Sequence, residues 1–168
     1  MDLAAEISKE YFFVQQTIES FNSQSMTIKG WSATLATAAI IASYKIEPEK
    51  RPGRLPLFLA VPIAFAFYVT DAFWKLFQKA FEIRTLEIEN YLECITEKAE
   101  SECSVVALQI TTSWKAAYPS WSWSIEGALK STAAFAQAMV NPAVLLPHAV
   151  IILVAVIAGL KFPPTPPA

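Results

Sequence analysis

The chain has 168 residues, of which 54% are hydrophobic and only 17% are charged, and its formal net charge is −2. Soluble globular domains carry about 25% charged residues, so this chain is poor in the side chains that cover a water-exposed surface. The negative net charge argues against a broadly basic nucleic-acid binder, and two cysteines argue against a disulfide-rich scaffold. The apolar content excludes intrinsic disorder.

Residues 1–29 are predicted to form an amphipathic helix. Its seam positions alternate steps of four and three residues, as in a heptad repeat. These positions are Ile7, Tyr11, Val14, Ile18, Phe21, Ser25 and Ile28. The helix is expected to continue into a first membrane-spanning segment at 30–44, because no proline intervenes. That segment has 15 residues. A spanning helix needs about 20 residues, so this one suffices only if Lys29 extends its charged end toward water.

A loop at 45–54 follows, rich in proline and basic residues. Residues 55–74 are the second predicted span, and the helical pattern runs on from it to about Glu100 as one long helix. The apolar face of this continuation contains Phe77, Phe81, Ile88, Leu92 and Ile95. We expect 75–130 to be a helical subdomain outside the membrane, ending in a Trp-rich interfacial segment.

Residues 131–161 are the third predicted span, and 162–168 form a proline-rich tail. The sequence therefore predicts an all-α integral membrane protein with three transmembrane helices and a helical cytoplasmic subdomain, assembled as an oligomer. The alternative is a soluble protein with three buried core helices. It is disfavoured because so short a chain would expose very few charges.

The orientation in the membrane is predicted from the cysteines. Basic residues near the membrane number five on each side, so the positive-inside rule gives no preference. Cys94 and Cys103 are expected to be free thiols, which suit a reducing compartment. We therefore expect a multi-pass protein of the bacterial inner membrane, with the N-terminus and 75–130 in the cytoplasm.

Small and hydroxylated residues predict a water-filled path. The candidate pore-lining residues are Ser32, Thr34, Thr37, Ser43 and Asp71. Small residues let helices approach closely in lipid, and an acid at membrane depth must face protein or water. The alternatives are plain helix packing for the small residues, and for Asp71 an ion pair with Lys75, four residues further on.

Basic side chains close to the membrane predict a collar for a phosphate-bearing ligand, and the alternative is that they only extend toward the membrane surface. They are Lys9, Lys29, Lys75, Lys79 and Arg84. His148 is expected to be a packed side chain. No cofactor, metal site or enzymatic activity is expected, because the sequence contains no nucleotide-binding or hydrolase motif.

Two motifs resemble those of a widespread group of small bacterial three-span membrane proteins. Ile28-Lys29-Gly30-Trp31 opens the first span, after the Asn/Ser-rich run Phe21–Thr27, and Asp71-Ala72-Phe73 ends the second. The likeness covers about residues 10–95, and the loop 45–54 departs from it by being more basic and richer in proline. The group is similar to membrane effectors of anti-phage defence systems, of which the Hailong type is the nearest.

The resemblance implies a homo-oligomeric channel that disrupts the membrane of an infected cell, in abortive infection. It also implies a nucleotide or oligonucleotide signal, made by a partner nucleotidyltransferase from the same operon. Two other functions stay open on the sequence. One is a non-conducting adaptor that docks a partner protein through Tyr11, Ile18, Phe77 and Ile88, and the other is a membrane subunit of a larger transporter.

Overall fold

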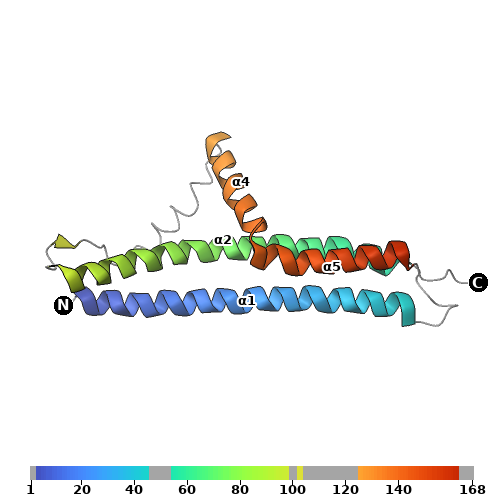
Figure 1. Cartoon of the computed structure of the whole chain (residues 1–168), viewed down its shortest axis with the longest axis horizontal. Helices are drawn as coiled ribbons and strands as arrows, with labels where there is room; N and C mark the ends of the chain where they lie inside the picture. Colours follow the sequence, from blue (N-terminus) through green and yellow to red (C-terminus); the bar gives the residue numbers. More distant parts are fainter. Residues whose placement is uncertain (1–2, 46–53, 99–101, 104–124, 163–168) are drawn as a thin grey trace, which may run out of the picture. The chain divides into compact units, whose positions relative to one another are not determined.

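The computed structural model describes residues 3–45, 54–98, 102–103 and 125–162. Its elements are α1 (Leu3–Lys45), α2 (Leu55–Glu97), α4 (Ile125–Met139) and α5 (Pro142–Lys161) (Figure 1). The described residues contain no strand, so the all-helical prediction is confirmed. Most of the predicted loop 45–54, most of the predicted tail 162–168, and residues 99–101 and 104–124 of the predicted subdomain 75–130 lie outside the described residues.

Two long helices run as the sequence predicted. α1 is unbroken through 43 residues, and α2 continues for 43 residues despite Pro62 in its first third. A proline inside a helix removes one backbone hydrogen bond, which neighbouring helices can compensate in a lipid environment.

Residues 131–161 were predicted as a single span, but the structure divides them between two helices. α4 ends at Met139, and Asn141 begins a new helix by accepting a hydrogen bond from the backbone amide of Ala143 at 3.0 Å. Pro142 occupies the first helical position, where its missing N–H costs nothing. The Asn-Pro pair therefore sets the start of α5 at Pro142.

Among the described residues, α2 and α5 are long and apolar enough to cross a membrane. α1 does not reach that standard of length and apolar composition. The described residues therefore contain two candidate spans, whereas the sequence predicted three. These two helices are weak evidence, by length and composition alone, for a membrane location.

The chain divides into two compact units, each described here by itself. Unit 1 comprises Met1–Ser23 and Trp74–Ala136. In it the seam of α1 meets the apolar face of α2. Ile7, Ile88 and Tyr91 form the buried core, and the partly buried residues packed on it are Tyr11, Leu92, Ile95 and Cys103.

A disulfide in unit 1 joins Cys94 and Cys103, with their Cα atoms 5.9 Å apart. The expectation of free thiols is therefore wrong. The two cysteines are nine positions apart in the chain, and the sequence alone could not show that they lie close together. The argument that used free thiols to place 75–130 in the cytoplasm loses its basis.

Unit 2 comprises Gln24–Phe73 and Gln137–Ala168. Most of its buried side chains are small or polar, and many large apolar side chains lie on its surface. The buried set includes Ser32, Ala36, Ser43, Ala60, Ala64, Asp71, His148 and Ala155, together with the larger Leu57, Tyr68 and Val144. The exposed set includes Phe58, Leu59, Ile63, Leu146, Val150, Leu153, Val154 and Leu160. So many exposed large apolar side chains are unusual for a water-soluble domain and are typical of helices packed in lipid.

Candidate functional site

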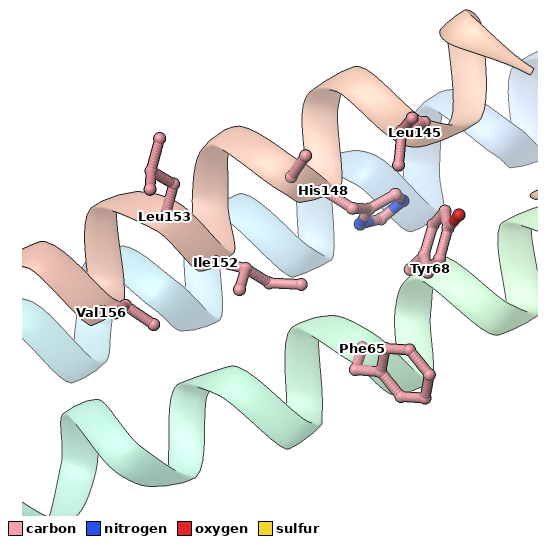
Figure 2. Close-up of a pocket in the computed structure, with 8 residues that line it drawn as sticks. Phe65, Tyr68, Leu145, His148, Ile152, Leu153 and Val156 are labelled. Carbon is pink, nitrogen blue, oxygen red and sulfur yellow. The ribbon is translucent and has the colours of Figure 1, made fainter. Parts of the chain in front are cut away.

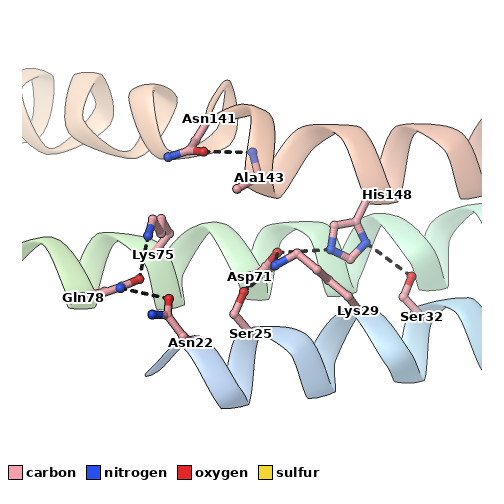
Figure 3. A network of polar contacts seen from close by, with 10 residues as sticks. All are labelled: Asn22, Ser25, Lys29, Ser32, Asp71, Lys75, Gln78, Asn141, Ala143 and His148. Atoms are coloured by element: carbon pink, nitrogen blue, oxygen red, sulfur yellow. Dashed lines mark hydrogen bonds and ion pairs between the residues drawn. The ribbon is translucent and has the colours of Figure 1, made fainter. Parts of the chain in front are cut away.

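The centre of unit 2 is a polar network around Asp71, which is fully buried on α2 (Figure 3). Lys29 places its Nζ atom 2.8 Å from Asp71 Oδ2. The hydroxyl of Ser25 donates a hydrogen bond to Asp71 Oδ1, and Lys29 donates one to Ser25. Ser25 and Lys29 are four residues apart on α1, so they share a helix face.

His148 brings α5 into the same network. Its Nδ1 atom is 3.3 Å from the hydroxyl oxygen of Ser32, and its Nε2 atom is 3.4 Å from Asp71 Oδ2. The ring is only 1% exposed, and Tyr68 packs beside it with ring centroids 5.8 Å apart. Three helices of unit 2 therefore contribute polar side chains to one buried point.

Two atoms of this network have no hydrogen bond among the described residues, namely Asp71 Oδ2 and His148 Nε2. Asp71 Oδ2 is contacted by Lys29 Nζ in the ion pair and, at a longer distance, by His148 Nε2. Nearly all buried polar atoms in proteins have a hydrogen-bond partner, and buried charges are costly even when paired. A polar cluster of this kind in an apolar helix bundle is a candidate functional site.

The predicted pore-lining residues do not share one surface. Ser32, Ser43 and Asp71 face the interior of unit 2, whereas Thr34 and Thr37 are exposed on the other side of α1. The Thr34 hydroxyl donates to the carbonyl of Gly30 at 2.8 Å, and Ser43 donates to that of Ala39 at 2.9 Å. Both hydroxyls are thus satisfied within their own helix.

The alternative partner predicted for Asp71, Lys75, is engaged elsewhere. Its Nζ atom donates to Gln78 at 2.7 Å and lies 3.6 Å from Glu82, both in unit 1. The ion pair of Asp71 is made instead by Lys29, from another helix. A spacing of four residues therefore indicated the wrong partner.

The predicted basic collar is also divided. Lys29 belongs to unit 2, whereas Lys9, Lys75, Lys79 and Arg84 belong to unit 1. Lys9 is paired with Glu6 at 2.8 Å, and Lys79 is exposed.

Arg84 is a buried structural residue of unit 1. Its guanidinium donates to both carboxylate oxygens of Glu10, at 2.8 and 2.9 Å, and to Glu87 at 3.0 Å. The hydrogen bonds that Arg84 donates to Glu10 raise the pKa of Arg84 above its ordinary value. Arg84 is therefore not available to a ligand in this state, although the sequence grouped it with the exposed lysines.

Sequence reasoning missed the roles of Ser25 and His148. Ser25 is a polar residue at a position of an apolar seam, and His148 is the sole histidine of the chain, within an otherwise apolar run. Both anomalies were visible in the sequence. Their proximity to Asp71 depends on tertiary packing and was not.

No protein-family model, curated protein or solved structure matches this chain. The polar network and the apolar surface of unit 2 are therefore the basis for a functional proposal.

Proposed function

We propose that this chain is an inner-membrane protein that assembles as a homo-oligomer and forms a gated pore, as an effector of anti-phage defence. The observation that carries the proposal is the arrangement of unit 2, in which large apolar side chains lie on the surface and the Asp71 network is buried. A bundle of this kind is stable in lipid, where polar groups must find partners within the protein.

The ion pair between Lys29 and Asp71 supports α1 as a membrane span in addition to α2 and α5. Because Lys29 is neutralised by Asp71, the membrane-embedded part of α1 need not begin at Gly30. From Ser25 to Lys45 the helix would extend for ~31 Å, at 1.5 Å per residue. That length matches the hydrocarbon core of a bilayer.

The exposed face of α1 supports the oligomer. It presents small side chains at helical spacing, which are Gly30, Ala33, Thr34, Thr37 and Ala38. A Cβ atom added at Gly30 would meet no atom within 4 Å, so this face is open in the single chain. We propose that it packs against the next copy, and that Thr34 and Thr37 line the path between copies. Ser32, Ser43 and Asp71 would instead hold each copy together.

The signal would act on unit 1. A nucleotide-type anion that bound Lys9, Lys75 and Lys79 would compete with the carboxylates of Glu6 and Glu82 for two of them. The proposed signal is made inside the cell by a partner nucleotidyltransferase. This part of the chain, with the N-terminus, would therefore be cytoplasmic.

Flux through vesicles containing the purified protein tests the proposal. A panel of cyclic and linear oligonucleotides is added, and release of a trapped cation dye is followed. We expect release with at least one nucleotide. We expect Thr37→Leu to reduce this release about tenfold, because it replaces a hydroxyl on the proposed path with a larger apolar side chain. The matched control is Thr70→Val, which removes an exposed hydroxyl on α2 that bonds only to Ala66. Absence of release with every nucleotide would contradict the pore.

The adaptor function has one observation in its favour. Phe12 and Phe13 of unit 1 are 71% and 59% exposed, so they offer an aromatic docking surface. The surface predicted from the sequence is not available, because Ile88 is fully buried and Tyr11 packs on its cluster. A stoichiometric partner lost on Phe12→Ser, together with absence of flux, would favour the adaptor.

A further inference from the structure

His148 is the one residue of the unit 2 network whose hydrogen bonds are incomplete on the side that faces a carboxylate. Its Nε2 atom and Asp71 Oδ2 are 3.4 Å apart, both are buried, and neither has a hydrogen bond. We propose that His148, Asp71 and Lys29 form a proton-binding site inside unit 2. One proton from water would bind at His148 Nε2, forming an N–H that donates to Asp71 Oδ2.

The carboxylate of Asp71 favours this protonated form. Asp71 Oδ2 only accepts, and it lies beside Nε2, whereas the Ser32 hydroxyl beside Nδ1 can donate or accept. A neutral ring can therefore satisfy both neighbours only with its proton on Nε2, whereas the protonated ring donates on both sides. The charge of the protonated ring would also face the negative charge of Asp71.

The polar and charged groups facing His148 come from two other helices. α2 contributes Asp71 and the ring of Tyr68, and α1 contributes Ser32 and the nearby cation Lys29. On its other side His148 borders a pocket whose remaining lining, apart from Tyr68, is aliphatic or phenyl side chains such as Phe65, Ile152 and Val156 (Figure 2). Asp71 is therefore the acid that would stabilise a charged ring.

Lys29 and His148 meet the same oxygen of Asp71. Lys29 lies closer, at 2.8 Å against 3.4 Å, and its side chain is 16% exposed whereas that of His148 is 1% exposed. A protonated His148 would compete with Lys29 for Asp71, and Lys29 has the access to water needed to withdraw. Either Lys29 or a protonated His148 can thus pair with the carboxylate of Asp71, and binding of the proton determines which of them does. This inference does not depend on pore formation, because its measurement is protonation itself.

The sole histidine of the chain makes the test direct. The untagged full chain, labelled with ¹⁵N-histidine in lipid nanodiscs, is titrated from about pH 8.5 to about pH 4.5, and both ring nitrogens are followed. We expect one protonation step at both nitrogens. Lys29→Gln should move its midpoint up by about one pH unit, because Asp71 loses its competing cation, and Asp71→Asn should move it down by about as much.

The control is Lys161→Gln, which removes an exposed cation at the far end of α5 and should leave the midpoint unchanged. If Asp71→Asn fails to fold, the wild type and Lys29→Gln still decide the outcome. A ring that stays neutral through the titration of the wild type would overturn the proposal. So would a midpoint in folded Lys29→Gln that equals the wild-type value.

Discussion

Arg84 and Glu10 form a two-pronged ion pair within unit 1, with Arg84 Nε 2.8 Å from Glu10 Oε1 and the NH2 nitrogen 2.9 Å from Oε2. Both side chains are buried, at 2% and 5% exposure. Glu10 raises the pKa of Arg84. While Glu10 is ionised, the resulting stabilisation is present at any pH below the ordinary pKa of arginine, and it is lost as the pH rises through the raised pKa of Arg84.

Removing one partner of this pair should destabilise unit 1 strongly. We expect Arg84→Met to lower the free energy of unfolding by about 3–5 kcal/mol, because it leaves the carboxylate of Glu10 buried and uncompensated. The double variant Glu10→Leu with Arg84→Met should recover most of the loss. The control, Lys79→Met, changes an exposed side chain and should cost less than about 0.5 kcal/mol. Thermal unfolding in detergent measures all three, and equal losses in Arg84→Met and Lys79→Met would contradict the structural role of Arg84.

The outer surface of unit 2 makes a second prediction, about membrane insertion. Leu153 is near the middle of α5 and 58% exposed, as a lipid-facing residue should be. Leu153→Arg should weaken insertion of α5 by about 2.5–3.5 kcal/mol, measured with a translocon insertion assay. The equally exposed Leu86 belongs to unit 1, and Leu86→Arg should leave membrane association unchanged. If Leu153→Arg changes membrane insertion no more than Leu86→Arg does, then α5 is not in contact with lipid at this position.

The disulfide makes a third prediction, about orientation. Cytoplasmic disulfides are reduced or transient, so the proposed orientation requires Cys94 and Cys103 to be thiols in living cells. A membrane-permeable maleimide added to intact cells should label both. After purification in air the bond between them should form, and it should stabilise unit 1 by about 2–3 kcal/mol relative to Cys94→Ser. A bond already complete in cells would place this part of the chain in an oxidising compartment and would reject the cytoplasmic orientation.

Helix continuity and helix faces were predictable from the sequence, because they depend on neighbours three and four residues apart. The seam through Ile7 and Val14 and the face through Ile88 are both buried as predicted. The start of α5 was also readable, since Asn141 followed by Pro142 is a helix-start signal that the hydrophobic average over 131–161 concealed.

The composition of the polar network was not predictable in the same way. Asp71 was singled out as an acid at membrane depth, but its partners come from α1 and α5, dozens of residues away in the chain. Ser32 faces the interior of unit 2 and Thr34 faces outward. A run of small residues has no hydrophobic periodicity from which the inward face of α1 could be predicted. The structure therefore changes the role of Asp71 from pore lining to the centre of a buried network.

The two described glycines in the helices of unit 2 give a matched test of the oligomer. A Cβ atom at Gly30 would meet nothing within 4 Å, whereas one at Gly159 would lie 3.9 Å from Leu57. Gly30→Leu should leave the single chain as stable as before, or more stable by up to about 1 kcal/mol through helix propensity, but it should block close approach of a second copy. Gly159→Leu should instead overpack the contact with α2 and cost about 1–3 kcal/mol of stability. Sedimentation in detergent measures the oligomer, and thermal unfolding measures the single chain. We expect Gly30→Leu to reduce the oligomer at least about tenfold at unchanged stability, because even a 1.4 kcal/mol loss of packing has that effect. An oligomer that withstands Gly30→Leu would show that copies do not meet through this face of α1.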